Sequence, residues 1–332
     1  INVKMLSPLA AGLLSFFIDN STTMIIAGSR GSGKTSLVAA LMQEILQNKR
    51  IIVQEDTLEL PVMYMKNIGY NIQRLKTKSS IGGVGDEATT EVKPEDALRT
   101  ALRLGDSALV VGEVRSVEAK VLYEAMRVGA AGNVVLGTVH ADSAYAVWDR
   151  VVNDLEVPTT SFKATDIVVV AKPIRFKGSL KSYRRIVQIT EVKKHWNIDP
   201  DAEGGLLNIM EYDASKDSLI LNEDALKDSE LFPKICKLTG MSIEEVWNII
   251  KLYSKEKEHQ VNVAKQMNVF ELLESEYTSI AHNKLLLLKE ELISEKGSKD
   301  YNSLYNAWQD WYDNFFAPQI IERYRNAKKD DI

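Results

Sequence analysis

The chain of 332 residues contains a single cysteine, Cys236, which excludes an internal disulfide and suits a reducing cytoplasm. No apolar run approaches the length of about 20 residues that a membrane-spanning helix needs. Positive charge is not in excess either, because 41 Lys and Arg against 46 Asp and Glu give a net charge of −5. A general nucleic-acid-binding protein usually carries an overall basic field, so that class is disfavoured, although a local basic channel stays open.

The rest of the composition is that of an ordinary globular protein, and the length is sufficient for two domains. The sequence begins at Ile1 instead of Met, so we expect further residues to precede it in the full protein. Ser7 and Pro8 have the residue types of an N-cap and a first helical position. They predict a helix that leads into the first core strand.

The strongest motif occupies residues 28–35, where G-S-R-G-S-G-K-T matches the phosphate-binding pattern G-x-x-x-x-G-K-[ST]. A short apolar run, residues 23–27, precedes it as a buried parallel strand would, and apolar side chains at helical spacing follow it. Lys34 can reach the outer phosphates, and the Thr35 hydroxyl can hold Mg²⁺. We therefore expect a nucleoside triphosphate and Mg²⁺ to bind at Gly28, Ser29, Arg30, Gly31, Ser32, Gly33, Lys34 and Thr35.

Strand-like and helix-like segments alternate after this loop. The expected strands are residues 50–54, 107–112, 133–139 and 166–171, and the expected helices are residues 94–104, 116–128 and 144–155. This order predicts an α/β fold with a mainly parallel sheet and helices on both faces. Antiparallel strands are expected at residues 184–192 and 206–212, and helices from about Glu223 onward. We thus predict a core over residues 1–175, an antiparallel β extension over 176–222 and a helical C-terminal region over 223–332.

Titratable residues follow three of the predicted strands: Glu55, Asp56 and Glu59 come after residues 50–54, Glu113 comes after residues 107–112, and His140 comes after residues 133–139. The carboxyl ends of parallel strands meet at one edge of a sheet, where ligands bind, so these residues are expected to converge. Each alone also has a purely structural interpretation. Together they predict a catalytic site in which Glu113 holds Mg²⁺ through water opposite Thr35, and Glu55 or Glu113 orients the attacking water.

Phosphoryl transfer also needs positively charged groups close to the outer phosphate oxygens, because those oxygens carry negative charge. The arginines close to these motifs are Arg99, Arg103 and Arg115, and we expect them to supply that charge. For Arg103, an exposed helical position without a catalytic role explains the residue equally well.

Four segments in order resemble those of the type II/type IV secretion ATPases. Residues 52–60, I-V-Q-E-D-T-L-E-L, resemble the acidic Asp box, and L-V-V-G-E-V-R at 109–115 is similar to the atypical Walker B strand. G-T-V-H-A-D-S at 137–143 resembles the His box, and L-R-T-A-L-R at 98–103 also matches. The segments at 149–154 and 160–166 are most similar to the archaeal branch of type IV pilus, archaellum and secretion ATPases.

The resemblance covers residues 1–175 and implies a RecA-like core that hydrolyses ATP to move pilin or exported protein. It implies a hexameric ring in the cytoplasm, at the inner face of the cell membrane, working on a polytopic membrane platform protein. Relatives carry an N-terminal domain before the core, which we expect to be absent from this chain because the phosphate loop begins at residue 28. Leu104-Gly105-Asp106 departs from the Arg-Pro-Asp of many relatives.

Two other functions stay open. A RecA-like ATPase could act on nucleic acid through residues 64–66 and 74–78, although the net charge makes this partner the less expected one. A nucleotide-gated scaffold with little turnover is the non-enzymatic alternative. The aromatic residues between Tyr301 and Phe316 recur at helical spacing, which predicts that they pack in the core of their own domain.

Overall fold

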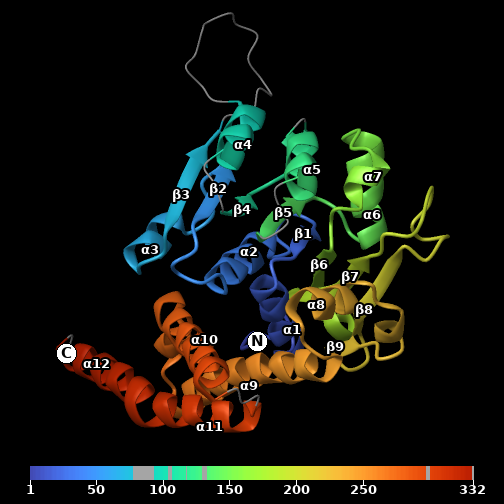
Figure 1. The fold of residues 1–332 in the computed structure, drawn as a ribbon. Coiled ribbons are helices and arrows are strands. Elements are labelled where there is room, and N and C mark those ends of the chain that lie inside the picture. Colours follow the sequence, from blue (N-terminus) through green and yellow to red (C-terminus); the bar gives the residue numbers. More distant parts are fainter. Residues whose placement is uncertain (78–92, 104–106, 117, 129–132, 297–299, 331–332) are drawn as a thin grey trace, which may run out of the picture. The chain divides into compact units, whose positions relative to one another are not determined.

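The computed structural model describes residues 1–77, 93–103, 107–116, 118–128, 133–296 and 300–330 (Figure 1). These residues form two compact units, a sheet unit of residues 18–235 and a helical unit of residues 1–17 with 236–332. The three-part division at residues 175 and 222 stays a prediction. Residues 78–92, which are rich in Ser, Gly and Thr, and Leu104-Gly105-Asp106 lie outside the described residues.

The sheet unit contains one nine-stranded sheet in the order β3-β2-β4-β5-β1-β6-β7-β8-β9. The six strands from β3 to β6 are parallel to one another, which confirms the mainly parallel sheet expected from the sequence. They are almost entirely buried except for β3, as strands covered on both faces should be. Their bounds are β1 Thr23–Gly28, β2 Ile51–Glu55, β3 Ile72–Lys76, β4 Ala108–Val111, β5 Val135–Val139 and β6 Ile167–Ile174.

Antiparallel strands extend the same sheet beyond β6. They are β7 Tyr183–Val192, β8 Leu206–Asp213 and β9 Ser218–Leu221, each pairing with the strand before it. The alternation read from the sequence therefore located β7 and β8 correctly. The β extension continues the hydrogen-bonded ladder of the parallel strands instead of forming a sheet of its own.

Helices cover both faces of the sheet (Figure 1). One face packs its apolar side chains, Ile25 and Ala27 of β1 among them, against a group of four helices. The alternate side chains of β1 face the other way, where α2 contacts β1 and β5. The helices of this unit are α2 Lys34–Gln43, α3 Val62–Asn67, α4 Pro94–Arg103, α5 Glu118–Val128, α6 Ala144–Asp149 with a π-helical continuation over Arg150–Asp154, α7 Thr159–Phe162 and the start of α8 Leu231–Thr239.

Strand β3 was not predicted. Only Ile72 and Leu75 of its five residues are apolar, and the strand forms the edge of the sheet with most side chains partly exposed. An edge strand needs apolar side chains toward its covered face only, so its sequence lacks the continuous apolar run that revealed the others.

Asp166 joins the start of β6 to the start of β1. Its Oδ2 accepts hydrogen bonds from the Thr23 N–H at 3.2 Å and the Thr23 hydroxyl at 3.1 Å, and Oδ1 lies 3.3 Å from the Nζ of Lys194 and of Lys234. Burial by itself raises the pKa of Asp166, but the two lysines and the Thr23 N–H together hold it below the ordinary value of 3.8. The ionised carboxylate therefore stabilises the fold.

Asp166→Asn should lower the free energy of unfolding by about 2 kcal/mol at neutral pH, because the partly exposed ammonium groups of Lys194 and Lys234 lose the buried carboxylate with which they pair. A lowered pKa contributes stability above the ordinary value and loses it as the pH falls through the lowered one. The deficit should thus shrink below a pH of about 3.8. Urea unfolding at neutral and acid pH measures it, with the exposed Asp224→Asn as control. A deficit independent of pH would contradict this account.

The helical unit begins with α1 Pro8–Asp19, whose last two residues already belong to the sheet unit. The Ser7 hydroxyl accepts a hydrogen bond from the Ala10 N–H at 3.2 Å, which confirms the predicted helix start. The unit also contains α9 Ile243–Met267, α10 Ser275–Lys296, α11 Tyr301–Trp311, a π-helical turn Tyr312–Phe316 and α12 Ala317–Asp330.

Two of the seven aromatic residues between Tyr301 and Phe316 lie in the interior of this unit, as their spacing predicted, whereas Phe315 is 60% exposed and the other four are half-buried. Trp308 and Tyr312 are fully buried and stack at 5.1 Å between ring centroids. The Trp308 indole donates a hydrogen bond to the Ala281 carbonyl of α10 at 2.8 Å, which pairs its buried N–H. Within the described chain, no helix combines the length and apolar character needed to cross a membrane.

Candidate functional site

The phosphate loop connects β1 to α2, as the sequence predicted. Gly33 is the N-cap of α2 and has φ 100°, a left-handed conformation that residues with a Cβ adopt only at a cost. This conformation lets the helix begin directly at Lys34, so its first N–H groups and the positive end of its dipole lie against the loop. The Ser32 hydroxyl is buried and has no hydrogen-bond partner among the described residues. Its position within the loop suits a polar ligand oxygen.

Lys34 lies across the loop that precedes it. Its ammonium donates hydrogen bonds to the carbonyls of Gly28 at 2.8 Å and Ser29 at 3.0 Å. Burial lowers the pKa of Lys34 below its ordinary value, while the charges of Glu113 and Glu59 oppose that shift. A further anion at the loop would favour the charged ammonium, which is the property a phosphate-binding lysine needs.

Glu113 and His140 meet, as their positions after neighbouring strands β4 and β5 predicted. His140 Nε2 lies 2.9 Å from Glu113 Oε1, and His140 Nδ1 lies 3.4 Å from the Lys34 Nζ. Nδ1 also lies 3.3 Å from the Gly28 carbonyl oxygen, so one edge of the ring faces the phosphate loop and the other contacts the Glu113 carboxylate. The His box, the Walker B strand and the phosphate loop are thereby joined by direct contacts.

Arg115 lies between two carboxylates. It contacts Glu113 Oε2 through one terminal nitrogen and Asp56 Oδ2 at 3.4 Å through the other. The hydrogen bond to Glu113 raises the pKa of the Arg115 guanidinium, so its charge is permanent. Its backbone N–H also donates to Glu118 Oε1 at 2.6 Å. Of the three arginines expected at the site, Arg115 is the one that the structure brings there.

Arg99 and Arg103 lie elsewhere on the sheet unit. Both are on the exposed side of α4, and within the described chain neither forms a hydrogen bond or ion pair with a residue of the phosphate loop or with Glu113. Their predicted role in offsetting phosphate charge stays a prediction.

Glu55 ends β2 and is 3% exposed. Its Oε1 accepts hydrogen bonds from the backbone N–H groups of Glu59 at 3.0 Å and Leu60 at 2.8 Å, and Oε2 lies 3.1 Å from Nε of Arg74. Arg74 also donates to the Leu60 carbonyl at 2.7 Å. Both oxygens of Glu55 are therefore engaged in shaping the loop after β2.

The loop after β2 brings a further carboxylate, that of Glu59, to the end of the phosphate loop. The Thr35 hydroxyl donates to Glu59 Oε2 at 2.8 Å. Asp56 and Glu59 were expected at this edge of the sheet together with Glu55, but neither was given a role. Arg74 was considered only for contact with nucleic acid. It lies on β3, the strand that was not predicted, so its pairing with Glu55 was not foreseen.

These residues surround a small hollow at the carboxyl ends of β2 and β4. Its lining includes the polar residues Thr35, Glu55, Asp56, Glu59, Glu113 and Arg115, together with Gly112 and Thr138. Carboxylate and hydroxyl oxygens are the ligand types that Mg²⁺ accepts, alongside water and phosphate oxygens. Among the described residues no cluster of three or more His, Cys, Asp or Glu could hold a metal alone. The carboxylate and hydroxyl oxygens of the hollow therefore suit a Mg²⁺ ion that takes its remaining ligands from water and from the phosphates of a bound nucleotide.

Gly112, the glycine before Glu113, makes room for Glu55. A Cβ at this position would lie 3.0 Å from Glu55 Cγ and 3.3 Å from the Gln54 carbonyl oxygen. The Gly-Glu ending of the Walker B strand therefore has a steric reason in this chain.

Gly112→Ala should cost about 1–3 kcal/mol of folding stability through this overpacking. Denaturant unfolding measures the cost, and a double-mutant cycle identifies its source. In a Glu55→Ala background, where the contacted Cγ is gone, most of the cost should disappear. If the stability losses of Gly112→Ala and Glu55→Ala are additive in the double variant, Gly112 is needed for a reason other than its contact with Glu55.

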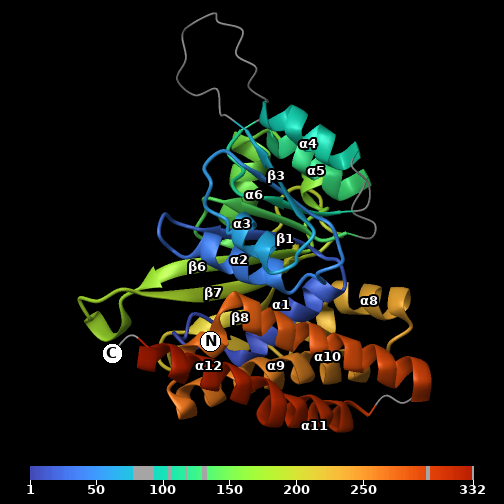
Figure 2. The same cartoon turned by 90° about the vertical axis from the view of Figure 1, so that its left-hand side faces the viewer.

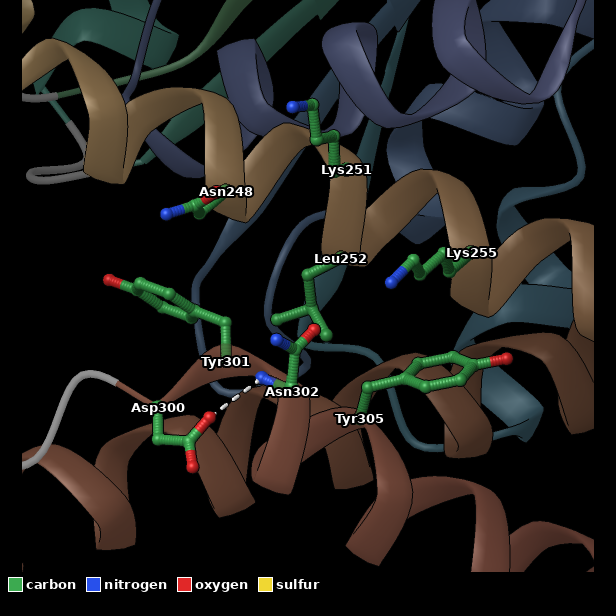
Figure 3. A pocket seen from close by; sticks show the side chains of 8 residues that line it. All are labelled: Asn248, Lys251, Leu252, Lys255, Asp300, Tyr301, Asn302 and Tyr305. Atoms are coloured by element: carbon green, nitrogen blue, oxygen red, sulfur yellow. Dashed lines mark hydrogen bonds between the residues drawn. The ribbon is translucent and has the colours of Figure 1, made fainter.

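Figure 3 shows a second pocket, which lies in the helical unit between α9 and α11. Lys251, Lys255, Tyr301 and Asn302 are among its lining side chains, and the N-cap Asp300 accepts a hydrogen bond from the Asn302 N–H at 3.1 Å. All its lining residues belong to the helical unit, and none of them was expected to carry chemistry. It is therefore separate from the phosphate-loop site.

The model of the family described as "Type II/IV secretion system protein" matches residues 3–202. The uncharacterized protein MJ1287 of Methanocaldococcus jannaschii is 28% identical over 250 residues, which are 75% of this chain and 85% of that protein. The type IV secretion system protein VirB11 of Bartonella quintana is 32% identical over 127 residues, which are 38% of this chain and 32% of VirB11. This chain thus spans about a third of VirB11.

A solved structure, the VirB11 ATPase of the Brucella suis type IV secretion system in complex with sulphate, aligns with a TM-score of 0.43 at 23% identity. The alignment covers 54% of this chain and 50% of that one. The family match spans the whole phosphate-loop site and more than half of the chain. This chain belongs to the type II/IV secretion system protein family.

Proposed function

We propose that this chain is an ATP-hydrolysing motor subunit of a secretion or pilus assembly machine, of the archaeal type IV pilus-like kind. The observation that carries the proposal is the series of contacts from Glu113 through His140 to Lys34. It connects a carboxylate able to act on water with the lysine of the phosphate loop. The similarity to MJ1287 supports the archaeal assignment.

In this proposal the loop from Gly28 to Thr35 binds the phosphates of ATP. Lys34 and Arg115 offset the charge on the outer oxygens. Thr35 and Glu113, the latter through water, hold Mg²⁺, which supplies further positive charge to the phosphates. Glu113 orients the attacking water, because its side chain is 16% exposed at the hollow beside Thr35, whereas the Glu55 side chain is 2% exposed and holds the loop after β2.

His140 is given a positioning role. Its contacts fix the Glu113 carboxylate relative to Lys34.

The quaternary part of the proposal is a hexameric ring at the cytoplasmic face of the cell membrane, acting on a polytopic platform protein. In such a ring the exposed Arg99 and Arg103 would serve the nucleotide of a neighbouring subunit. ATP binding at a subunit boundary can then be converted into rotation of one subunit against the next.

Release of phosphate from ATP, measured with and without single-stranded or duplex DNA, tests the activity. We expect Mg²⁺-dependent turnover that nucleic acid does not stimulate, together with a rise in molecular mass when a non-hydrolysable ATP analogue is added. Stimulation by DNA would favour the nucleic-acid motor instead. Nucleotide binding without turnover would favour the gated scaffold. The nucleic-acid alternative is the weaker one, because Arg74, one of the residues considered for contact with nucleic acid, is paired with Glu55.

A further inference from the structure

The hairpin formed by β6 and β7 extends past the neighbouring strands and ends in a short helical turn (Figure 2). We call residues 172–184 the hairpin tip. Ile174 pairs with Tyr183 at the last position of the ladder, so the residues between them lie beyond the sheet. Most of the tip is exposed, and it belongs entirely to the sheet unit.

The hairpin has a charge opposite to that of the whole chain. Residues 167–190 contain six basic and no acidic residues, although the chain as a whole has more acidic than basic ones. Five of the six basic residues belong to the tip: Lys172, Arg175, Lys177, Lys181 and Arg184. The tip is therefore a concentrated positive patch on an acidic protein.

The apex of this patch is apolar. Leu180 is 95% exposed, which is the highest exposure of any large apolar side chain described, and the next residue is Lys181. Tyr183 lies nearby, with Lys181 Nζ and the Arg185 guanidinium each 5.4 Å from its ring centroid. A leucine between basic residues, close to a tyrosine, is the arrangement that suits a membrane interface.

The base of the hairpin is held firmly. Arg185 is buried and pairs with Asp217 through two hydrogen bonds, Nε to Oδ1 at 2.8 Å and Nη2 to Oδ2 at 2.9 Å. The Tyr212 hydroxyl donates to the same carboxylate at 2.7 Å. Arg185 thus anchors the hairpin to β8 and β9, and the tip is presented at a defined position.

We propose that the hairpin tip is an attachment site for the surface of a membrane rich in anionic phospholipid. The basic residues would contact lipid phosphates, and Leu180 would enter the boundary between headgroups and acyl chains. Nucleic acid fits less well, because its bases need open aromatic faces and the Tyr183 ring already has two cations nearby. This site goes beyond the proposed motor function and does not depend on it.

Co-sedimentation with vesicles tests the proposal. The chain should bind vesicles of phosphatidylcholine mixed with phosphatidylglycerol, and should bind vesicles of phosphatidylcholine alone much less. Lys177→Gln with Lys181→Gln should weaken the binding roughly 25-fold, at about fivefold for each charge. Leu180→Ser should weaken it about tenfold. Added salt should reduce what remains of the charge-dependent binding.

Matched controls separate the tip from general effects. Ile198→Ser removes another exposed side chain, at 80% exposure, and Lys227→Gln with Lys237→Gln removes two exposed charges elsewhere. Both should bind vesicles like the unmodified chain. Equal losses in the controls, no preference for anionic vesicles, or tip variants that lose only DNA binding or only self-association would each overturn the proposal. ATP turnover without vesicles should be unchanged in the tip variants, so the motor function is tested separately.

Discussion

Glu113→Gln should leave nucleotide binding nearly intact and slow ATP hydrolysis by about 10²–10⁴-fold. The substitution keeps the size of the side chain and one oxygen that can accept from His140 or Arg115. It removes the negative charge that a water-activating group needs. The phosphate loop contacts remain, because Lys34 reaches Glu113 only through His140 and by charge at a distance.

Two measurements decide this prediction, the affinity for a fluorescent nucleotide and the rate of phosphate release. Glu156→Gln is a suitable control, since it removes an exposed carboxylate that pairs only with Lys120 among the described residues. Loss of binding and turnover together in Glu113→Gln would indicate that Glu113 is needed for folding of the site. Unchanged turnover would assign the activation of water to a different group.

Much of the fold could be predicted from the sequence because buried parallel strands have a strong local signal. Strands β1, β2, β4, β5 and β6 each contain a buried and mostly apolar run, and the order of strands and helices then favours one architecture. The convergence of Glu113, His140 and the phosphate loop followed from the same reasoning. Residues that end neighbouring parallel strands must share an edge.

What the sequence could not reveal depends on contacts between distant segments. Arg74 reaches Glu55 from an edge strand without an apolar pattern, and Glu59 reaches Thr35 through the shape of a loop. Helical spacing in α4 predicts that Arg99 and Arg103 are exposed, but it does not predict which residues of other elements they would meet. Spacing within a motif predicts neighbours along one element, whereas these contacts need the folded chain.

Lys34→Ala should abolish detectable ATP turnover and weaken nucleotide binding at least about 100-fold. The ammonium is the positive charge closest to the loop carbonyls of Gly28 and Ser29, and removing one member of a buried charge pair typically costs several kcal/mol of binding free energy. Titration calorimetry with ADP and with a non-hydrolysable ATP analogue measures the affinity. Lys49→Ala, which removes an exposed lysine of the same unit, provides the control.

The same variant should fold as well as the unmodified chain, which separates lost binding from lost structure. Burial lowers the pKa of Lys34, so its charged form costs folding free energy at neutral pH. Alanine removes that cost while it gives up the hydrogen bonds to Gly28 and Ser29, and the two effects oppose each other. The midpoint of thermal unfolding should therefore change by only a few degrees without nucleotide, and the stabilisation that nucleotide gives the unmodified chain should vanish. Normal ATP hydrolysis in Lys34→Ala would exclude the phosphate loop as the site of turnover.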